Sequence, residues 1–381
     1  MKKICYVVTI PLTIRSFFIP QLQYISTNGY SVSVICSDDG NIKDELGENI
    51  RFIPLDIPRG ISFFKSIKTI KELLRIFNRE KFDVIQYSTP NASLYASIAA
   101  KMAKCKVRNY HLMGYRYLGV EGLFRRILKL IEKVTCYCST SIECVSDSNL
   151  QLGISEKLFQ PEQATVVWNG SSGGVELKRF NYNYRNQYRK EIRDKYNIGY
   201  NELVFGFVGR ITRDKGINEL LEAFQHIKNA KLLMVGMIDD ADSLNQELYE
   251  SSLHDETIIY TGNVDDVEKY YAAIDVLVLP SYREGFGNVV IEAGAMGTPA
   301  IVTNIPGPVD TIVQNETGLM VEEKNVKSLE GAMQRIFSLD YKAMGQKANE
   351  YIVRSFDSER LNTYILQRKN ELLNELLGIA E

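Results

Sequence analysis

The sequence has 381 residues and a formal net charge of -2, with 45% hydrophobic and 24% charged residues. A chain of this length is too long for one ordinary core and favours two domains. The composition is that of a globular protein, and no apolar run reaches the roughly 18 residues that a membrane-spanning helix needs. These properties argue against a helical membrane protein.

The charge is divided unevenly along the chain. Residues 1–165 contain 22 Lys and Arg against 15 Asp and Glu, whereas residues 166–381 contain 23 against 32. A basic half suits an anionic partner, such as a phosphate-bearing substrate or an anionic membrane surface, although a scattered solvated surface has the same composition. Nucleic acid is disfavoured, because the basic residues are not interleaved with an aromatic platform or a known binding motif.

The N-terminus has two lysines followed by an apolar run, which resembles the start of a signal peptide. The run stops at Pro11 and no small-residue cleavage site follows, so a buried first strand fits better. All six cysteines lie in the first 144 residues, without the spacing of a disulfide framework or a zinc site. We therefore expect reduced core thiols and a cytoplasmic protein.

Short β-rich apolar runs alternate with amphipathic helical stretches, which is the pattern of a parallel sheet in an α/β fold. The pattern occurs twice. In the first half it predicts strands at 3–9, 31–36, 84–87, 106–111 and 141–145, with helices at 63–78 and 121–133. In the second half it predicts strands at 203–209, 231–236, 257–261, 276–280 and 299–303, with a last helix at 358–377.

Residues 169–200 interrupt this pattern with a glycine- and serine-rich run and a polar stretch rich in Tyr and Arg, which is typical of a connection between domains. We therefore predict domains at 1–168 and 201–357 with a linker at 169–200, and we expect the helix at 358–377 to join the first domain. Two doubly wound domains would turn the carboxyl ends of their strands toward a cleft, where such sheets bind ligands.

The first motif is GRITRDKG at residues 209–216, which leaves a predicted strand and enters an amphipathic helix. Its two cations, Arg210 and Lys215, stand at the carboxyl end of that strand. There they could neutralise a diphosphate and stabilise the charge that develops on a leaving phosphate. An ordinary basic turn would have the same residues, so the motif alone leaves both interpretations open.

The second motif is PSYREGFGNVVIEA at residues 280–293, which follows an apolar strand and opens a helix. Its small residues expose backbone N–H groups and the positive end of the helix to an anion, while Glu284 and Glu292 can accept hydrogen bonds from hydroxyls. This pattern is typical of a site for a sugar diphosphate. The alternative, a loop charge and a surface carboxylate, fits less well beside glycines and apolar residues.

Together these segments and GAMGTP at residues 294–299 resemble glycosyltransferase family 4 of the GT-B fold, whose Glu-x7-Glu spacing is present here. The resemblance covers nearly the whole chain. Residues 110–119 and 169–180 are similar to the bacterial capsular and O-antigen branch of the family, which mostly builds lipid-linked glycans. The resemblance implies an α/β, GT-B fold, in which two Rossmann-like domains with parallel sheets face a deep interdomain cleft.

The resemblance implies roles for particular residues. Arg210 and Lys215 would hold the diphosphate of the donor, Glu284 would contact hydroxyls of the donor sugar, and Glu292 would hold the ribose diol. Further donor contacts are implied for Gly209, Asn263, Val264, Gly285, Phe286, Gly287, Asn288 and Val289. Of these, residues 286–289 would contribute backbone N–H groups, and residues 263–264 would seat the nucleobase.

The family mechanism implied is transfer with retention of configuration, by a same-face displacement in which the departing phosphate helps to deprotonate the acceptor hydroxyl. It needs no metal ion and no other cofactor. The sequence DDAD at residues 239–242 could pass for a metal-binding motif. It follows a strand in a solvated, loop-like stretch, so we expect no metal there.

One departure from the family concerns a histidine. Many relatives have a His-Gly pair at the end of the fourth strand of the first domain, where this sequence has Met113-Gly114. Because residues two apart in a strand face the same side, His111 could point toward the same cleft one step deeper. A structural histidine in the core is the alternative, and we therefore favour a mechanism that does not require His111 as a base.

The acceptor-side candidates are Thr13, Arg15, His111, Met113 and Arg116. The first two belong to a loop at residues 9–16 that lacks the paired glycines usual in the family. They are plausible neighbours of the acceptor or its phosphate, although Arg15 could simply begin the next helix.

Residues 115–130, which include Arg116, combine aromatic residues, Leu and Ile at helical spacing, and several cations. That mixture suits a surface lying on anionic lipid. An amphipathic helix packed on the sheet, with an ordinary charged outer face, is the alternative.

We therefore predict a cytoplasmic, retaining glycosyltransferase at the inner face of the plasma membrane. It would move a sugar, such as an N-acetylated hexose, from a UDP-sugar to a polyprenyl-diphosphate-linked glycan or oligosaccharide acceptor in bacterial surface polysaccharide synthesis. Two alternatives are a non-hydrolysing sugar-nucleotide epimerase, which the Glu-x7-Glu spacing disfavours, and a nucleotide-sugar-binding scaffold without catalysis, which the intact charged residues disfavour.

Overall fold

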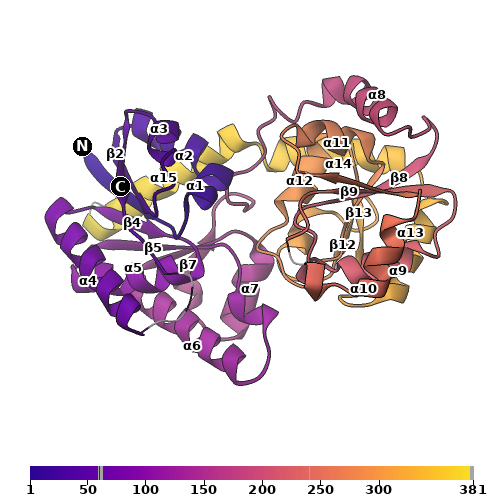
Figure 1. Ribbon diagram of the computed structural model, residues 1–381. Helices are drawn as coiled ribbons and strands as arrows, with labels where there is room; N and C mark the ends of the chain where they lie inside the picture. The colour runs from indigo at the N-terminus through magenta and orange to yellow at the C-terminus, as the bar shows by residue number, and fades with distance from the viewer. Residues whose placement is uncertain (59, 61–62, 240, 378–381) are drawn as a thin grey trace. The chain divides into compact units, whose positions relative to one another are not determined.

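The computed structural model describes residues 1–58, 60, 63–239 and 241–377. The chain divides into unit 1, Met1–Gly173 with Glu359–Glu381, and unit 2, Gly174–Ser358. Each unit has a parallel sheet covered by helices (Figure 1), so the predicted α/β class with two Rossmann-like domains is confirmed. Within the described residues, no helix has both the length and the apolar character required to cross a bilayer.

The described part of unit 1 contains a seven-stranded parallel sheet in the order β3-β2-β1-β4-β5-β6-β7. Its strands are β1 (Lys2–Val7), β2 (Tyr30–Cys36), β3 (Ile50–Pro54), β4 (Val84–Tyr87), β5 (Val107–Leu112), β6 (Ser141–Cys144) and β7 (Ala164–Val166). Its helices are α1 (Pro11–Phe17), α2 (Ile19–Thr27), α3 (Ile42–Leu46), α4 (Phe63–Glu80), α5 (Pro90–Met102), α6 (Gly122–Cys138), α7 (Asp147–Ser155) and α15 (Ser358–Leu377).

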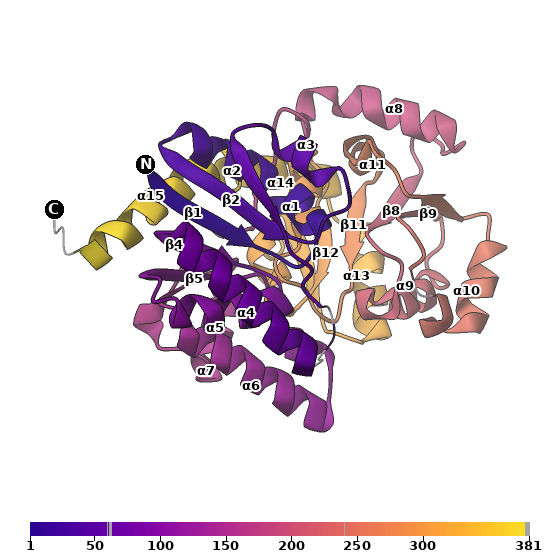
Figure 2. The same ribbon diagram turned by 60° about the vertical axis from the view of Figure 1, so that its left-hand side comes forward.

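Two hydrophobic clusters cover the two faces of this sheet. Val7 of β1 belongs to one cluster, with Tyr95 of α5 and Leu128 of α6. Its neighbour Tyr6 belongs to the other cluster, with Ile365 of α15, because successive residues of a strand face opposite sides. Figure 2 shows α4, α5 and α6 side by side along the first face. The C-terminal helix therefore belongs to the core of unit 1.

The described part of unit 2 contains a six-stranded parallel sheet in the order β10-β9-β8-β11-β12-β13. Its strands are β8 (Leu203–Val208), β9 (Ala230–Val235), β10 (Ile258–Gly262), β11 (Val276–Leu279), β12 (Ala300–Thr303) and β13 (Gly318–Val321). Its helices are α8 (Arg185–Lys195), α9 (Ile217–Phe224), α10 (Gln246–Leu253), α11 (Val267–Ala273), α12 (Asn288–Ala295), α13 (Val326–Ile336) and α14 (Tyr341–Ser355).

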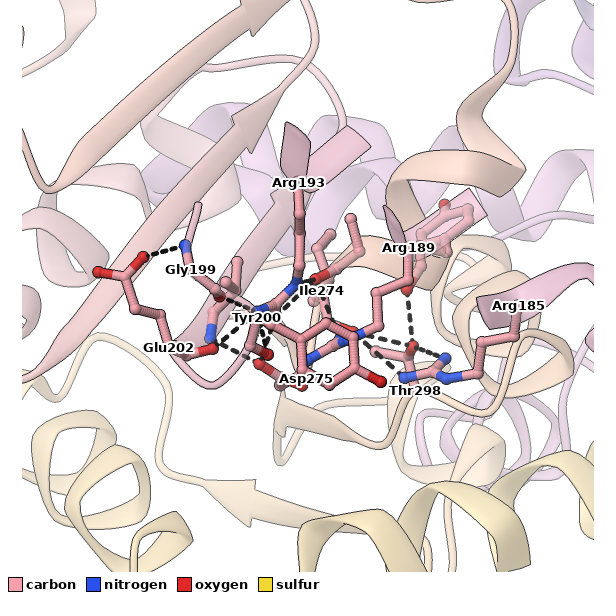
Figure 3. A network of polar contacts seen from close by, with 12 residues as sticks. Arg185, Arg189, Arg193, Gly199, Tyr200, Glu202, Ile274, Asp275 and Thr298 are labelled. Carbon is pink, nitrogen blue, oxygen red and sulfur yellow. Dashed lines mark hydrogen bonds and ion pairs between the residues drawn. The ribbon is translucent and has the colours of Figure 1, made fainter. Parts of the chain in front are cut away.

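The segment expected as a linker, residues 169–200, differs from that expectation. It contains α8, whose Arg189 and Arg193 donate to the buried carboxylate of Asp275 at 2.8 and 2.7 Å (Figure 3). Buried guanidinium groups need such partners, and here unit 2 supplies them. The chain therefore enters unit 2 at residue 174, and α8 is part of that unit rather than a free connection.

Candidate functional site

The two charged motifs of unit 2 meet at the carboxyl end of the sheet, where β8 and β11 are neighbours. Gly216, at φ 70°, is the N-cap residue of α9. A Cβ atom on Gly216 would lie 2.1 Å from the carbonyl oxygen of Pro280, so only glycine fits this turn. The backbone N–H of Tyr282 also donates to the carbonyl oxygen of Asp214 at 2.9 Å. These contacts hold the two motifs together.

Lys215 and Glu284 form an ion pair at this junction. The Lys215 Nζ atom lies 2.6 Å from Oε1 of Glu284, and the two side chains are only 18% and 15% exposed. The Ser281 hydroxyl donates to the same carboxylate oxygen at 2.8 Å. The structure thus brings together a cation and a carboxylate that the sequence assigned to neighbouring parts of one ligand.

A cavity of about 320 Å³ opens beside Arg210. Its lining residues come from the ends of β8 and β9 and from the segment after β10: Val208, Gly209, Arg210, Val235, Gly236, Met237, Asp239, Asn263, Val264 and Val267. The strand ends approach closely, because a Cβ atom on Gly236 would lie 1.9 Å from the carbonyl oxygen of Gly209.

This cavity has apolar walls and a few polar groups, as small-molecule sites commonly do. Asn263 and Val264, which the sequence assigned to a nucleobase, both line it. Arg210 stands at the cavity with its Nη1 atom 2.6 Å from Oδ2 of Asp239, and the two side chains are 60% and 53% exposed. The cavity lining does not include Lys215 or Glu284.

Glu292 lies within α12, half-buried, and accepts a hydrogen bond at Oε2 from the hydroxyl of Tyr271 at 2.8 Å. Burial raises the pKa of Glu292 to about 7, an effect that the hydrogen bond from Tyr271 opposes. Tyr271 is fully buried in α11. The sequence did not single out Tyr271, since an aromatic residue in an apolar helical stretch has the pattern of a core residue.

The N-terminus of α12 is the other predicted anion contact. Gly287, at φ 105°, precedes the helix, and the N–H groups of the first helical turn, including Asn288 and Val289, have no acceptor within the helix. The ring of Phe286 packs against Phe356 with centroids 5.4 Å apart, so its side chain is occupied by an aromatic contact. Gly285 packs closely against the neighbouring glycine turn at residue 307.

The candidates at the start of unit 1 lie in α1. Thr13 is half-buried, and its N–H donates to the carbonyl oxygen of Ile10. Arg15 forms ion pairs with Asp39 at 2.6 Å and with Glu45, and it lowers the pKa of Asp39 to about 2. Arg15 is thus paired with two carboxylates in the protein alone, and its place beside an acceptor phosphate stays a prediction.

His111 is only 6% exposed and packs edge-on against Phe18, with ring centroids 5.6 Å apart. It lies beside Glu143 of β6 in the strand register. Burial lowers the pKa of His111 to about 4, so the ring is neutral near pH 7. A neutral ring in the core has the features of the structural histidine that the sequence offered as the alternative.

The two remaining acceptor-side candidates lie beyond β5. Met113 is half-buried and packs against the hydrophobic cluster that contains α15. Arg116 begins a short 3-10 helix (Arg116–Gly119), and its Nη1 atom is 3.5 Å from Oδ1 of Asn91.

The structure describes three residues of the acidic run at 239–242. Asp239 pairs with Arg210, Asp242 is exposed, and Asp240 lies outside the described residues. The two motifs did not reveal the roles of Asp239 and Tyr271. Asp239 contacts Arg210 and Tyr271 contacts Glu292, in each case with at least one helix or strand between them in the sequence. No short sequence spacing therefore predicts these contacts.

Comparison with protein families matches residues 188–352 to "Glycosyl transferases group 1" and residues 3–146 to "Glycosyl transferase 4-like". The chain is 30% identical over 386 residues to the capsular polysaccharide biosynthesis glycosyltransferase CapM of Staphylococcus aureus, with 99% of each chain covered. It is 26% identical over 352 residues to the Escherichia coli UDP-Gal:alpha-D-GlcNAc-diphosphoundecaprenol alpha-1,3-galactosyltransferase, covering 88% of this chain and 87% of that one.

Two solved structures are similar over nearly the whole chain. Anabaena HepE, crystallised in complex with UDP, has a TM-score of 0.79 at 16% identity, covering 97% of this chain and 100% of that one. A glycosyltransferase from Rickettsia africae has a TM-score of 0.79 at 20% identity, covering 100% of this chain and 99% of that one. At these identities the likeness establishes the fold.

Proposed function

The chain belongs to glycosyltransferase family 4 of the GT-B fold, and on that basis we propose that it transfers a sugar with retention from a UDP-sugar to a lipid-linked acceptor. The sugar would be a hexose or an N-acetylhexosamine. The observation that carries this proposal is the Lys215–Glu284 ion pair at the junction of the two motifs, in the same unit as a cavity lined by Arg210, Asn263 and Val264.

In this proposal unit 2 binds the donor. The uracil base would enter the cavity beside Asn263, and the ribose diol would donate hydrogen bonds to Glu292. Arg210 and Lys215 would bind the diphosphate, which develops further negative charge as its bond to the sugar breaks. Preorganised cations stabilise that charge more than they stabilise the bound substrate, and this difference lowers the barrier. Glu284 would accept a hydrogen bond from a hydroxyl of the donor sugar.

The proposed reaction is a same-face displacement. The bond between the anomeric carbon and the β-phosphate oxygen breaks, and the acceptor oxygen forms a new bond to that carbon from the same side. The acceptor proton passes to the departing phosphate oxygen, so UDP is the leaving group and no protein base is needed. The neutral, buried His111 is compatible with this route. We propose that no metal ion takes part, because the two cations supply the charge.

We propose that unit 1 binds the acceptor and lies on the inner face of the plasma membrane. The E. coli relative is named for a diphosphoundecaprenol-linked acceptor, and the S. aureus relative for capsular polysaccharide synthesis, which supports a polyprenyl-diphosphate-linked acceptor in surface polysaccharide synthesis. On α6, Leu123, Ile127 and Leu130 are exposed at helical spacing beside the exposed cations Arg126 and Lys133. Such a face suits an anionic bilayer.

The experiment is a donor and acceptor screen with the full chain. The purified protein is incubated with UDP-hexoses and UDP-N-acetylhexosamines, with and without polyprenyl-diphosphate-linked N-acetylglucosamine, and released UDP and glycolipid product are measured. UDP release that requires both substrates, with an α-linked product from an α-linked donor, supports the proposal. Activity unaffected by a metal chelator would support the metal-independent route.

Two other outcomes would replace the proposal. A change of the free nucleotide sugar without transfer would indicate an epimerase. Binding of UDP-sugars without turnover on any acceptor would indicate a nucleotide-sugar-binding scaffold.

A further inference from the structure

Helix α11 connects the cavity of unit 2 to the carboxylate of Glu292. Val267, at the start of the helix, lines the cavity. Tyr271 lies one turn further along, and residues four apart share one face of a helix. The Tyr271 hydroxyl reaches Oε2 of Glu292 at 2.8 Å. The same face of α11 thus contacts the cavity at one end and the carboxylate at the other.

The charge on Glu292 depends on its surroundings. Burial favours the protonated acid, whereas the Tyr271 hydroxyl and the positive charge of Arg179 favour the carboxylate, and Glu268 acts against it. Arg179 and Glu268 are themselves paired at 2.9 Å, so their effects largely cancel. On its other side α12 meets α14 through the apolar contact of Gly294 with Ile352. The Tyr271 hydroxyl is therefore the main group that favours the ionised form.

Tyr271 is held rigidly in this role. Its carbonyl oxygen accepts a hydrogen bond from the Thr298 hydroxyl at 2.7 Å, and Arg185 of α8 donates to the same hydroxyl at 2.8 Å (Figure 3). The end of α11 is fixed as well, because Arg193 donates to the carbonyl oxygen of Ala273 at 3.0 Å. Burial raises the pKa of Tyr271 well above its usual value, so the phenol remains a proton donor.

We propose that Tyr271 is a positioning residue for the donor nucleotide, because its hydroxyl occupies Oε2 of Glu292, holds the group as a carboxylate and leaves Oε1 to accept from the ribose diol. In the part of the chain that the structure describes, no protein hydrogen bond to that Oε1 atom is formed. The inference rests on the proposed function, in which Glu292 binds the ribose. The inference adds that the affinity for the donor nucleotide depends on pH, because the Tyr271–Glu292 hydrogen bond influences the charge on Glu292.

A protonated Glu292 would present an O–H group to the ribose and lose an acceptor. UDP affinity should therefore fall as pH falls through the pKa of Glu292, which lies at about 7. Removing the Tyr271 hydroxyl takes away a hydrogen bond to the charged form, which should move the midpoint upward by about one pH unit and weaken UDP binding at about pH 7 by about fivefold.

The test is isothermal titration calorimetry of UDP with the full chain, from about pH 5.5 to about pH 8.5. Tyr271→Phe should show the raised midpoint and the weaker binding at neutral pH. Tyr270→Phe is the matched control, since its hydroxyl contacts Lys195 at 3.0 Å and Tyr196 at 3.4 Å, both outside the Tyr271–Glu292 pair. Both quantities should stay within about twofold. Glu292→Gln cannot titrate, so the pH dependence of its UDP binding should be reduced to the part that comes from the terminal phosphate of UDP, which titrates at about pH 6.

The outcomes separate the two hypotheses. If the wild-type chain binds UDP and Tyr271→Phe has the same midpoint and affinity, the inference about Tyr271 is overturned. The donor assignment then stands. A wild-type chain that binds no UDP overturns the donor assignment and the inference together. If Tyr271→Phe does not fold, Glu292→Gln decides, because retention of the full wild-type pH dependence in that variant overturns the role of the pair.

Discussion

Lys215 and Glu284 are separated by 69 positions in the sequence, yet their charged atoms lie 2.6 Å apart in a largely buried setting. The Gly216 turn and the end of β11 impose this contact, because no side chain other than hydrogen fits between them. Because this ion pair forms without a bound ligand, both side chains are already held in place. Lys215 would then bind the diphosphate, and Glu284 the sugar hydroxyl, without further ordering. The pair therefore gives the most direct test of the donor site.

Lys215→Ala or Glu284→Ala should lower kcat/KM by at least about two orders of magnitude, the usual cost of losing a preorganised charged contact. The expected measurement is acceptor-dependent UDP release. Lys228→Ala is the matched control, since Lys228 is exposed at the other end of the same βα unit, and its activity should match the wild type. Near-full turnover of either site variant would refute the assigned site.

Asp239→Asn should strengthen UDP binding by roughly threefold, because Arg210 would lose a competing anion and the approaching diphosphate would meet less repulsion. The Arg210–Asp239 pair is more than half exposed, and such surface pairs contribute little to stability. The thermal midpoint should therefore stay constant while the dissociation constant falls. Asp242→Asn, which alters an exposed neighbour, serves as the control. Weaker binding by Asp239→Asn would instead mean that Asp239 itself holds the nucleotide.

His111 should make stability depend on pH. Its folded-state pKa is about 4 against an ordinary 6.5, so between these values the unfolded chain binds more protons and stability rises with pH. The contribution is fully present above about pH 6.5 and is lost as pH falls toward 4, by at most about 3 kcal/mol. When the pH is lowered from about 7.5 to about 5, the thermal midpoint of His111→Gln should drop less than the thermal midpoint of the wild type.

His226→Gln is the control for this measurement, since His226 is 59% exposed beside Glu330. A pH dependence of stability that is identical in His111→Gln and the wild type would contradict the assignment of His111 as a buried neutral residue.

Asp275→Ala should destabilise unit 2 by about 3 to 5 kcal/mol, because it leaves Arg189 and Arg193 buried without their counter-ion. Urea denaturation followed by far-ultraviolet circular dichroism measures this change. Asp194→Ala removes only an exposed partner of Lys190, and it should cost less than about 0.5 kcal/mol. Equal effects of the two substitutions would show that the α8 arginines do not depend on Asp275.

All but one of the strands that were predicted from the sequence lie in the interior of their sheet; the exception is β10, a partly exposed strand at the edge of unit 2. The apolar run of β8, for example, is fully buried in the structure, and its length and composition were sufficient to place it. The strands that were not predicted lie at or near sheet edges: β3 and β13 at the edge positions and β7 at the other edge of unit 1. Short, partly exposed strands such as β7 have no clear apolar pattern.

The charged motifs of the site were also visible in the sequence, because glycines and charges at a strand end impose a local turn. Contacts between distant segments were not visible. Lys369 and Glu143, for instance, form a buried ion pair of 2.6 Å across 226 positions, and only the packing of α15 on unit 1 creates it. The role of α8 was missed for the same reason, since its arginines look like those of a polar linker until Asp275 is placed beside them.

The exposed face of α6 should bind anionic membranes. Leu123 and Leu130 are 73% and 62% exposed, and insertion of such side chains into a bilayer would gain roughly 1.5 kcal/mol or more each. Leu123→Glu with Leu130→Glu should therefore reduce flotation with phosphatidylglycerol-containing vesicles by at least about tenfold, and turnover on free UDP-sugar with a water-soluble acceptor analogue should be unchanged.

Leu253→Glu is the matched control, because Leu253 is 45% exposed at the end of α10 in unit 2. It should leave flotation unchanged, and vesicles of neutral phosphatidylcholine should bind the wild-type chain more weakly, since exposed cations such as Arg126 and Lys133 favour anionic lipid. Equal flotation of the α6 double variant and the wild type would mean that this face is an ordinary solvated surface. The lipid-linked acceptor would then have to reach unit 1 by another face.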